Sequence, residues 1–141
     1  MLNLFPEGCT TNGSSMVKFK KGAFFNLRPV RPAVLKYYSP GISPTQDSAG
    51  FLYHTLLTTM CIFIRIDLVI LPVFAPNDYF WKNHWDSSKE EKWEAFARVT
   101  REIMAKEWGG PVSDHSMEDK FEYKEILKQR AKKGKGSSKL E

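Results

Sequence analysis

The clearest periodic pattern of apolar and polar residues along the chain lies in residues 88–109. Apolar residues recur there at intervals of three and four with charged residues between them, which predicts a helix that turns one face to a core. Ser88 and Glu91 have the spacing of a capping box, and the run Gly-Gly-Pro at 109–111 predicts the end of the helix. The expected core-facing residues are Trp93, Phe96, Ala97, Thr100, Ile103, Met104 and Trp108.

Shorter patterns with a period of two, or with continuous apolar runs, predict strands elsewhere. Residues 17–20 alternate, residues 31–38 read as a strand with a proline at its entrance, and residues 67–74 read as a core strand. Residues 1–5 have the composition of a strand end that a proline and a glycine then break. A chain that opens on a strand end is expected to be a fragment, a truncated product or a subunit that a partner completes.

The most apolar window covers residues 51–74, and its interpretation is open. The uncharged run of residues 48–64 is 17 residues long, just below the roughly 18–20 that usually span a bilayer. Arg65 and Asp67 then interrupt it. We therefore expect a buried or interfacial helix over residues 51–64, with a transmembrane span as the alternative.

Residues 77–85 place four aromatic side chains in a short link. Tryptophan and tyrosine at this density are typical of a bilayer interface and also of a lid over a core, which is the commoner case in a soluble domain. A second capping pattern at residues 116–119 predicts a short helix through Leu127 that decays into a Lys/Gly/Ser tail. The other elements lie within residues 1–119, and residues 120–141 form a basic tail.

The net charge of +5 belongs to the tail. Residues 1–119 hold 13 basic and 13 acidic side chains, whereas residues 120–141 hold 8 basic and 3 acidic ones. Between Glu7 and Asp47 there are six basic residues and no acidic one. A stretch of one sign attracts anions such as phosphate, although a solvated basic face has the same composition.

The two cysteines, Cys9 and Cys61, exclude a disulfide scaffold and have no metal-ligand spacing. We expect a chain with reduced thiols in an intracellular compartment, and both cysteines as small core or loop residues.

The candidate chemistry lies near the start of the chain, where a Phe-Pro-Glu-Gly turn precedes hydroxyl residues and a run of lysines. Glycine lets backbone amides approach an anion, hydroxyls donate to phosphate oxygens, and lysine supplies point charge. The Glu7 carboxylate would repel a phosphate. We therefore expect it to accept a hydrogen bond from a glycerol or sugar hydroxyl, or to pair with a basic residue. The candidate binding residues, suited to a phosphorylated polyol, are Glu7, Gly8, Thr10, Thr11, Lys18 and Lys21.

Three motifs in fixed order give the chain a family resemblance. They are LFPEGCTTN at residues 4–12, FKKGAF at 19–24 and VRPAVLKY at 30–37, followed by LPVFAP at 71–76 and VSDHSMED at 112–119. This arrangement resembles the second half of a lysophospholipid acyltransferase domain, and most of all the lysophosphatidylcholine acyltransferase branch. The resemblance covers about residues 2–120.

The resemblance implies transfer of an acyl group from acyl-CoA, as co-substrate without a further cofactor, to a lysophospholipid or glycerol-phosphate hydroxyl at a membrane surface. It implies an α/β fold, a mixed sheet with flanking helices, that is incomplete here because residues 1–119 are the back half of the domain. Glu7 and Gly8 would place the acyl acceptor, and the segment around Pro32 would shape a substrate channel. Cys9 stands where the family usually has threonine. The implied location is membrane-associated, at the endoplasmic reticulum or alternatively in mitochondria.

The family's catalytic base is the histidine of an H-x-x-x-x-D motif, which this sequence lacks. The residues five positions after His54, His84 and His115 are Thr59, Lys89 and Lys120. We therefore expect no catalytic residue here and either of two functions: part of an acyltransferase whose histidine comes from elsewhere, or a non-catalytic subunit of a larger assembly. A protein partner could cover the open sheet edge and the tail. No basic-aromatic signature predicts nucleic-acid binding.

Overall fold

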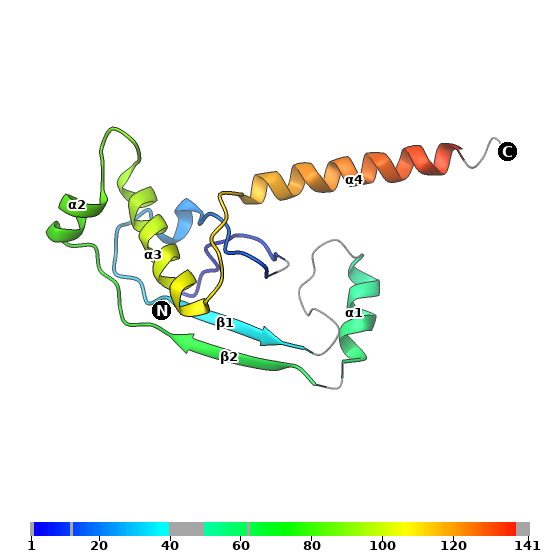
Figure 1. Cartoon of the computed structure of the whole chain (residues 1–141), viewed down its shortest axis with the longest axis horizontal. Helices are drawn as coiled ribbons and strands as arrows, with labels where there is room; N and C mark the ends of the chain where they lie inside the picture. Colours follow the sequence, from blue (N-terminus) through cyan, green and yellow to red (C-terminus); the bar gives the residue numbers. More distant parts are fainter. Residues whose placement is uncertain (1, 12, 40–49, 62, 138–141) are drawn as a thin grey trace.

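The computed structural model describes residues 2–11, 13–39, 50–61 and 63–137 (Figure 1). Its elements are the 3₁₀ turn η1 (Lys21–Ala23), β1 (Ala33–Tyr38), α1 (Phe51–Thr59), β2 (Arg65–Ile70), α2 (Asp78–His84), α3 (Lys92–Trp108) and α4 (Met117–Ser137). The predicted α/β class is confirmed, as a small fragment of helices around a two-stranded antiparallel sheet. The boundary at residue 119 remains a prediction, and α4 continues across it.

Helix α3 is the centre of the packed part of the molecule. Its N-cap is Glu91, whose side chain forms a reciprocal capping box with Glu94, and Gly109 ends it with a left-handed φ of 85°. The predicted cap at Ser88 is wrong by three residues. The backbone amide and hydroxyl of Ser88 bond instead to Asp86 Oδ1, at 3.0 and 2.7 Å, and close a separate turn before the helix.

The core forms around the apolar face of α3. Phe96 is fully buried, and its ring centroid lies 5.3 Å from those of both Phe24 and Phe74. The predicted stripe is buried or half-buried except at Ile103, whose side chain is 38% exposed. The buried cluster consists of Met16, Phe19, Phe24, Val34, Phe80, Phe96, Ala97, Val99, Met104 and Ala105.

Strands β1 and β2 form an antiparallel hairpin in which Ala33 pairs with Ile70 and Tyr38 with Arg65. One face packs on the core through Val34, and Lys36 Nζ donates to the Glu107 carbonyl of α3 at 2.8 Å. The opposite face is apolar and exposed. We call it the outer face of the hairpin; it carries Leu35, Tyr37, Ile66, Leu68 and Ile70.

The second predicted strand begins and ends earlier than expected. It covers Arg65–Ile70 instead of residues 67–74. The Leu71 amide still bonds to the Pro32 carbonyl at 2.9 Å, but Pro32 has no N–H to continue the ladder, and pairing resumes only as the isolated bridge between Val30 and Phe74. Its expected burial is also wrong on one face, since every second residue of β2 is exposed. A strand covered on one side only alternates in exposure in this way.

The strand expected at residues 1–5 is absent from the described part, residues 2–5. Leu2, Leu4 and Phe5 are exposed, and the Phe5 carbonyl instead accepts from Gly8 in a turn. Residues 17–20 are extended without belonging to a named strand, and their predicted alternation is confirmed because Val17 and Phe19 are buried and Lys18 is exposed. Just before them, Met16 forms a parallel bridge with Val112.

Helices α1, α2 and α4 differ from their predictions. Helix α1 is shorter than residues 51–64 and has no buried residue, so the buried alternative is wrong. Helix α2 was not predicted, and its buried Phe80 makes it a lid on the core. Helix α4 runs to Ser137 instead of ending near Leu127, and it projects away from the body (Figure 1).

No helix in the described ranges is both long enough and apolar enough to cross a membrane.

Candidate functional site

The Phe-Pro-Glu-Gly segment forms a tight turn, as the sequence indicates. The Gly8 amide donates to the Phe5 carbonyl at 3.1 Å, and Gly8 has a φ of +72°, a backbone conformation that side chains disfavour. The Lys20 amide donates to the Pro6 carbonyl at 2.7 Å. This bond fixes the turn against the extended segment 16–20, which itself packs into the core.

Glu7 is a half-buried carboxyl in this turn. Burial raises its pKa above the usual 4.5, and a hydrogen bond from the Val17 backbone amide opposes the shift in part. The Glu7 carboxyl is thus shielded from water and fixed in direction by the backbone. Both functional and structural carboxylates have this property.

Lys20 is the lysine that lies against Gly8. A Cβ added to Gly8 would come within 3.3 Å of Lys20 Cδ and 3.5 Å of the Met117 sulfur at the start of α4. Lys20 Nζ lies 2.5 Å from Glu118 Oε1, which together with Ser116 lowers the Glu118 pKa to about 2. Lys20 was not among the predicted binding residues.

The two lysines that the sequence did select lie apart from this contact. Lys18 is exposed, and its amide donates to the His115 carbonyl at 3.0 Å. Lys21 Nζ lies 3.5 Å from Glu91 Oε2 at the start of α3 and 5.5 Å from the Trp93 ring centroid. The turn therefore brings together Glu7, Gly8 and Lys20, and the contacts of Lys21 connect η1 to α3.

The hydroxyl residues after the turn form local contacts. The Thr10 carbonyl accepts from Lys120 Nζ of α4, and Thr11 Oγ1 accepts from the Gly13 amide at 3.3 Å. Cys9 between them and the glycine is a half-buried free thiol, as is Cys61. Helix α4 thus contacts the candidate loop through Met117, Glu118 and Lys120, a contribution that no sequence pattern indicated.

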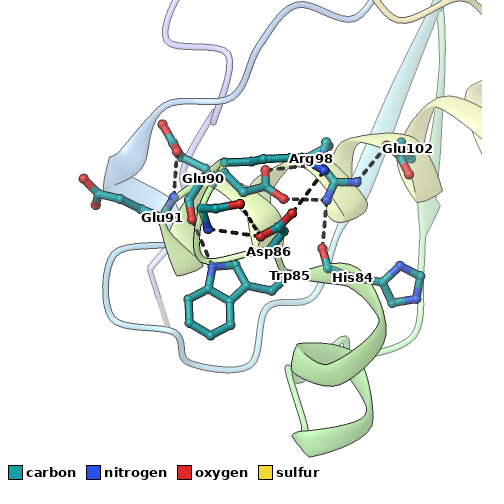
Figure 2. Close-up of polar contacts among 10 residues, drawn as sticks. His84, Trp85, Asp86, Glu90, Glu91, Arg98 and Glu102 are labelled. Atoms are coloured by element: carbon teal, nitrogen blue, oxygen red, sulfur yellow. Dashed lines mark hydrogen bonds and ion pairs between the residues drawn. The ribbon is translucent and has the colours of Figure 1, made fainter.

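A second polar cluster, centred on Arg98, lies where the end of α2 meets α3 (Figure 2). Arg98 binds Glu90 through two nitrogens, at 2.7 and 3.3 Å, and also donates to the His84 carbonyl at 2.9 Å. Glu102 accepts a longer bond at 3.4 Å. These contacts and the residues around them line a shallow hollow of about 400 Å³.

The Arg98 cluster is explained by folding alone. Its guanidinium satisfies the carbonyl at the end of α2 and the carboxylate that precedes α3, so it ties the lid helix to the core helix. Asp86 in the same turn has its pKa lowered to about 2, chiefly by hydrogen bonds from Ser88. Nothing in this arrangement requires a substrate.

Arg101 is a buried cation that sequence reasoning missed. Its Nη1 donates to the Ser113 carbonyl at 3.0 Å, which holds segment 111–115 beside α3. Its Nε is buried and has no hydrogen-bond partner. Arg101 lies between Ala97 and Ala105 on the buried face of α3, and it was missed because a charged residue is expected to face solvent.

The three histidines have different surroundings. His54 lies on α1 with its Nε2 buried and without a hydrogen-bond partner, and the His84 ring stacks on Phe80 with centroids 5.5 Å apart. His115 Nδ1 lies 3.5 Å from Asp119 Oδ2, but the His115 side chain is 81% exposed. Within the described ranges, no group of histidine, cysteine and acidic residues could hold a metal ion.

Comparison with known proteins gives a consistent set of relatives. The chain is 37% identical over 120 residues to lysophosphatidylcholine acyltransferase of Drosophila melanogaster and 36% identical over 120 residues to lysophosphatidylcholine acyltransferase 2 of Homo sapiens, which in each case covers 82% of the chain. It is 33% identical over 126 residues, or 88% of the chain, to lysophospholipid acyltransferase LPEAT1 of Arabidopsis thaliana.

The matched part of each relative is small. It amounts to 20% of the Drosophila and human proteins and 29% of the Arabidopsis protein, so the chain spans about a fifth to a third of the curated relatives. No family model matches the chain. No solved structure matches it either.

Proposed function

This chain belongs to the lysophospholipid acyltransferase family, and from that premise we propose that it supplies the acyl-acceptor side of such an enzyme. The observation that carries the proposal is the turn in which Gly8 has a φ of +72° and lies against Lys20, beside the half-buried Glu7. Exposed backbone at a glycine, a lysine and an oriented carboxyl are the groups that a glycerophosphate ester needs.

In the proposed complex the phosphate of a lysophospholipid binds at Gly8 and Lys20. The ammonium of Lys20 is held by Glu118 in the free protein, so the phosphate replaces this carboxylate as its partner. Thr10, Thr11 and Lys18 add donors around the headgroup. Glu7, whose half-burial disfavours its charged form, accepts a hydrogen bond from the free glycerol hydroxyl and orients it. Lys21 acts at a distance by holding η1 on α3.

The acyl transfer itself needs a base that these 141 residues do not provide. A histidine from outside the sequence removes the proton of the acceptor hydroxyl, and the oxygen attacks the thioester carbonyl of acyl-CoA. The carbon–sulfur bond breaks, and the CoA thiolate takes up the proton. The chain alone is therefore inactive, and the complete enzyme acts at an intracellular membrane, such as that of the endoplasmic reticulum or the mitochondrion.

A headgroup titration tests the proposed binding site. Water-soluble glycerophosphocholine is added to the ¹⁵N-labelled chain, and amide shifts are followed by NMR. We expect saturable shifts at Glu7, Gly8 and Lys20, which Lys20→Ala abolishes and Lys106→Ala, on the far end of α3, leaves unchanged. Shifts that cluster elsewhere, or that persist in Lys20→Ala, would contradict the proposal.

A second candidate function, a non-catalytic subunit, is favoured by the outer face of the hairpin. Its five large apolar residues are exposed, which is unusual for a face of a sheet in a finished domain. A protein partner that covers this face would explain it. Copurification of a stoichiometric partner, lost on Leu68→Asp, together with no effect of Lys20→Ala on the assembly's function, would favour the subunit over the enzyme.

A further inference from the structure

Arg101 is a cation on the buried face of α3, one turn after Ala97 and one turn before Ala105. The side chain of Arg101 is only 9% exposed. The two alanines are small, which leaves room for the long side chain beside the helix. Arg101 Nη2 lies 4.0 Å from Asp114 Oδ1, but the Asp114 side chain is 93% exposed, so this ion pair is weak.

The weak ion pair does not account for the burial of this cation. A buried guanidinium costs free energy unless its donors are bonded. Nη1 donates to the Ser113 carbonyl at 3.0 Å, whereas Nε is buried and has no hydrogen-bond partner among the described residues. An apolar side chain at this position would avoid that cost. The bond to Ser113 is therefore the contact that accounts for an arginine here.

The segment that Arg101 holds pairs with the extended segment near the start of the chain. The Met16 amide donates to the Pro111 carbonyl at 3.0 Å, and the Ser113 amide donates to the Met16 carbonyl at 2.9 Å. Between these two bonds, Met16 and Val112 form a parallel bridge, and Figure 1 shows the link from α3 to α4 beside the N-terminal segment. The position of Ser113 therefore fixes the backbone of Met16.

The backbone amide of Val17, the next residue, contacts the candidate binding turn. It donates to the Glu7 carboxyl, and the Lys20 amide donates to the Pro6 carbonyl at 2.7 Å. Consecutive amides of an extended chain point in opposite directions, so Met16 pairs on one side while Val17 binds Glu7 on the other. The contacts form one continuous series, in the order Arg101, Ser113, Met16, Val17 and Glu7.

We propose that Arg101 is a positioning residue for Glu7: by holding Ser113, it fixes the Val17 amide that orients the Glu7 carboxyl. The inference deepens the proposed function and rests on it, because the proposed function assigns the acceptor hydroxyl to Glu7. Arg101 acts through the backbone of two paired segments. Without the arginine, the Glu7 carboxyl loses its fixed direction and no longer aligns the hydroxyl.

A purely structural role of Arg101 makes a different prediction. If the arginine only adds stability, any other truncation of the buried face of α3 should affect Glu7 in the same way. Val99 is buried and lies two positions before Arg101, and residues two apart on a helix point in nearly opposite directions. Val99→Ala is therefore the matched control.

A pH titration of the full ¹⁵N-labelled chain without ligand tests the proposal. In the parent chain the Val17 amide shift should follow the protonation of Glu7, and Glu7→Gln should abolish this dependence. Glu118 stays ionised meanwhile, since its pKa is about 2. Arg101→Met should lower the pH-dependent change of the Val17 shift by at least about threefold. Val99→Ala should leave it unchanged.

The conservative variant Arg101→Lys keeps a donor for the Ser113 carbonyl and should restore most of the Val17 response. Hydrogen-exchange protection of α3 shows whether each variant is folded. If Arg101→Met does not fold, native-state hydrogen exchange of the parent chain gives the answer. The Val17 amide should then exchange in the same opening event as the amides of Met16 and Ser113.

A Val17 amide that follows Glu7 in folded Arg101→Met as it does in the parent would overturn the inference. So would an equal loss in Val99→Ala, since it assigns the effect to stability, or a Val17 amide that exchanges independently of Met16 and Ser113. The titration contains no headgroup. A failure here is therefore distinguishable from a failure of the glycerophosphocholine titration, which reads Gly8 and Lys20.

Discussion

Two apolar regions of this chain differ in burial. Phe96, in the aromatic cluster around α3, is fully buried, whereas Leu52 on α1 is 83% exposed and the outer face of the hairpin is exposed as well. The two regions have similar side chains, so the difference lies in what the rest of the chain offers them. The α3 stripe packs against residues 16–34 and α2, whereas no residue of α1 is fully buried.

The largest effect should come from truncating the centre of the packed region. Phe96→Ala removes a fully buried ring that contacts Phe24 and Phe74, and we expect a loss of about 3–5 kcal/mol in the free energy of unfolding. Leu56→Ala on α1 should change it by no more than about 0.5 kcal/mol. Urea denaturation followed by tryptophan fluorescence measures both. Equal losses would show that α1 is packed in solution and would remove the contrast.

The link between the lid helix and the core helix should rank second. Arg98→Met removes the bonds to Glu90 and to the His84 carbonyl, at a cost of about 1–2 kcal/mol because the site is partly open to water. Hydrogen exchange should speed up in α2 and not in α1. If α2 keeps its protection, the Arg98 cluster does not hold the lid.

Two glycines at helix ends offer a matched pair. Gly109 ends α3 with a φ of 85°, so Gly109→Ala should cost about 1 kcal/mol in strain. Gly50 precedes α1 with a φ of −60°, and an added Cβ there meets nothing within 4 Å, so Gly50→Ala should stay within about 0.5 kcal/mol. Thermal unfolding of both variants is the measurement. A costly Gly50→Ala would place α1 in a tighter environment than the one described.

The smallest effect concerns Glu7 and depends on pH. Burial raises the pKa of Glu7 above 4.5, so its stabilising contribution is complete below pH 4.5 and is lost as the pH rises through the raised pKa. Glu7→Gln removes this dependence and should gain stability relative to the parent chain between acidic and neutral pH. Urea titrations at several pH values measure the difference. An opposite slope would mean that Glu7 is paired with a cation.

The sequence predicted the elements whose pattern is local. The α3 stripe, the Gly109 stop and β1 follow from periodicity and from glycine chemistry. The N-cap lies at Glu91 instead of Ser88 because Ser88 bonds to Asp86 in a separate turn, while Glu91 and Glu94 cap each other. Helix α2 was missed because its signals, Asn77 as a cap and the buried Phe80, are short and become clear only when α3 is in place.

The candidate site could be predicted only in part. The Glu7–Gly8 turn follows from Phe-Pro-Glu-Gly, but the choice of Lys20 as its neighbour depends on the bond to Pro6 and on the start of α4, which lies 98 residues further along the chain. Long-range pairings of this kind leave no trace in local spacing. The exposure of α1 could not be predicted either. Hydropathy measures the tendency of a segment to leave water, but it does not say what the segment packs against.

The most direct test of the central claim replaces the matched part of the Drosophila relative with this chain and measures thiol release from acyl-CoA. We predict turnover that depends on lysophosphatidylcholine, that the 141-residue chain alone lacks, and that Gly8→Val lowers by at least about tenfold. The matched Gly109→Ala variant should keep most of the activity. A folded hybrid that releases no thiol, or one in which Gly8→Val is as active as the parent, would contradict the assignment of the acyl-acceptor site to the Glu7–Gly8 turn.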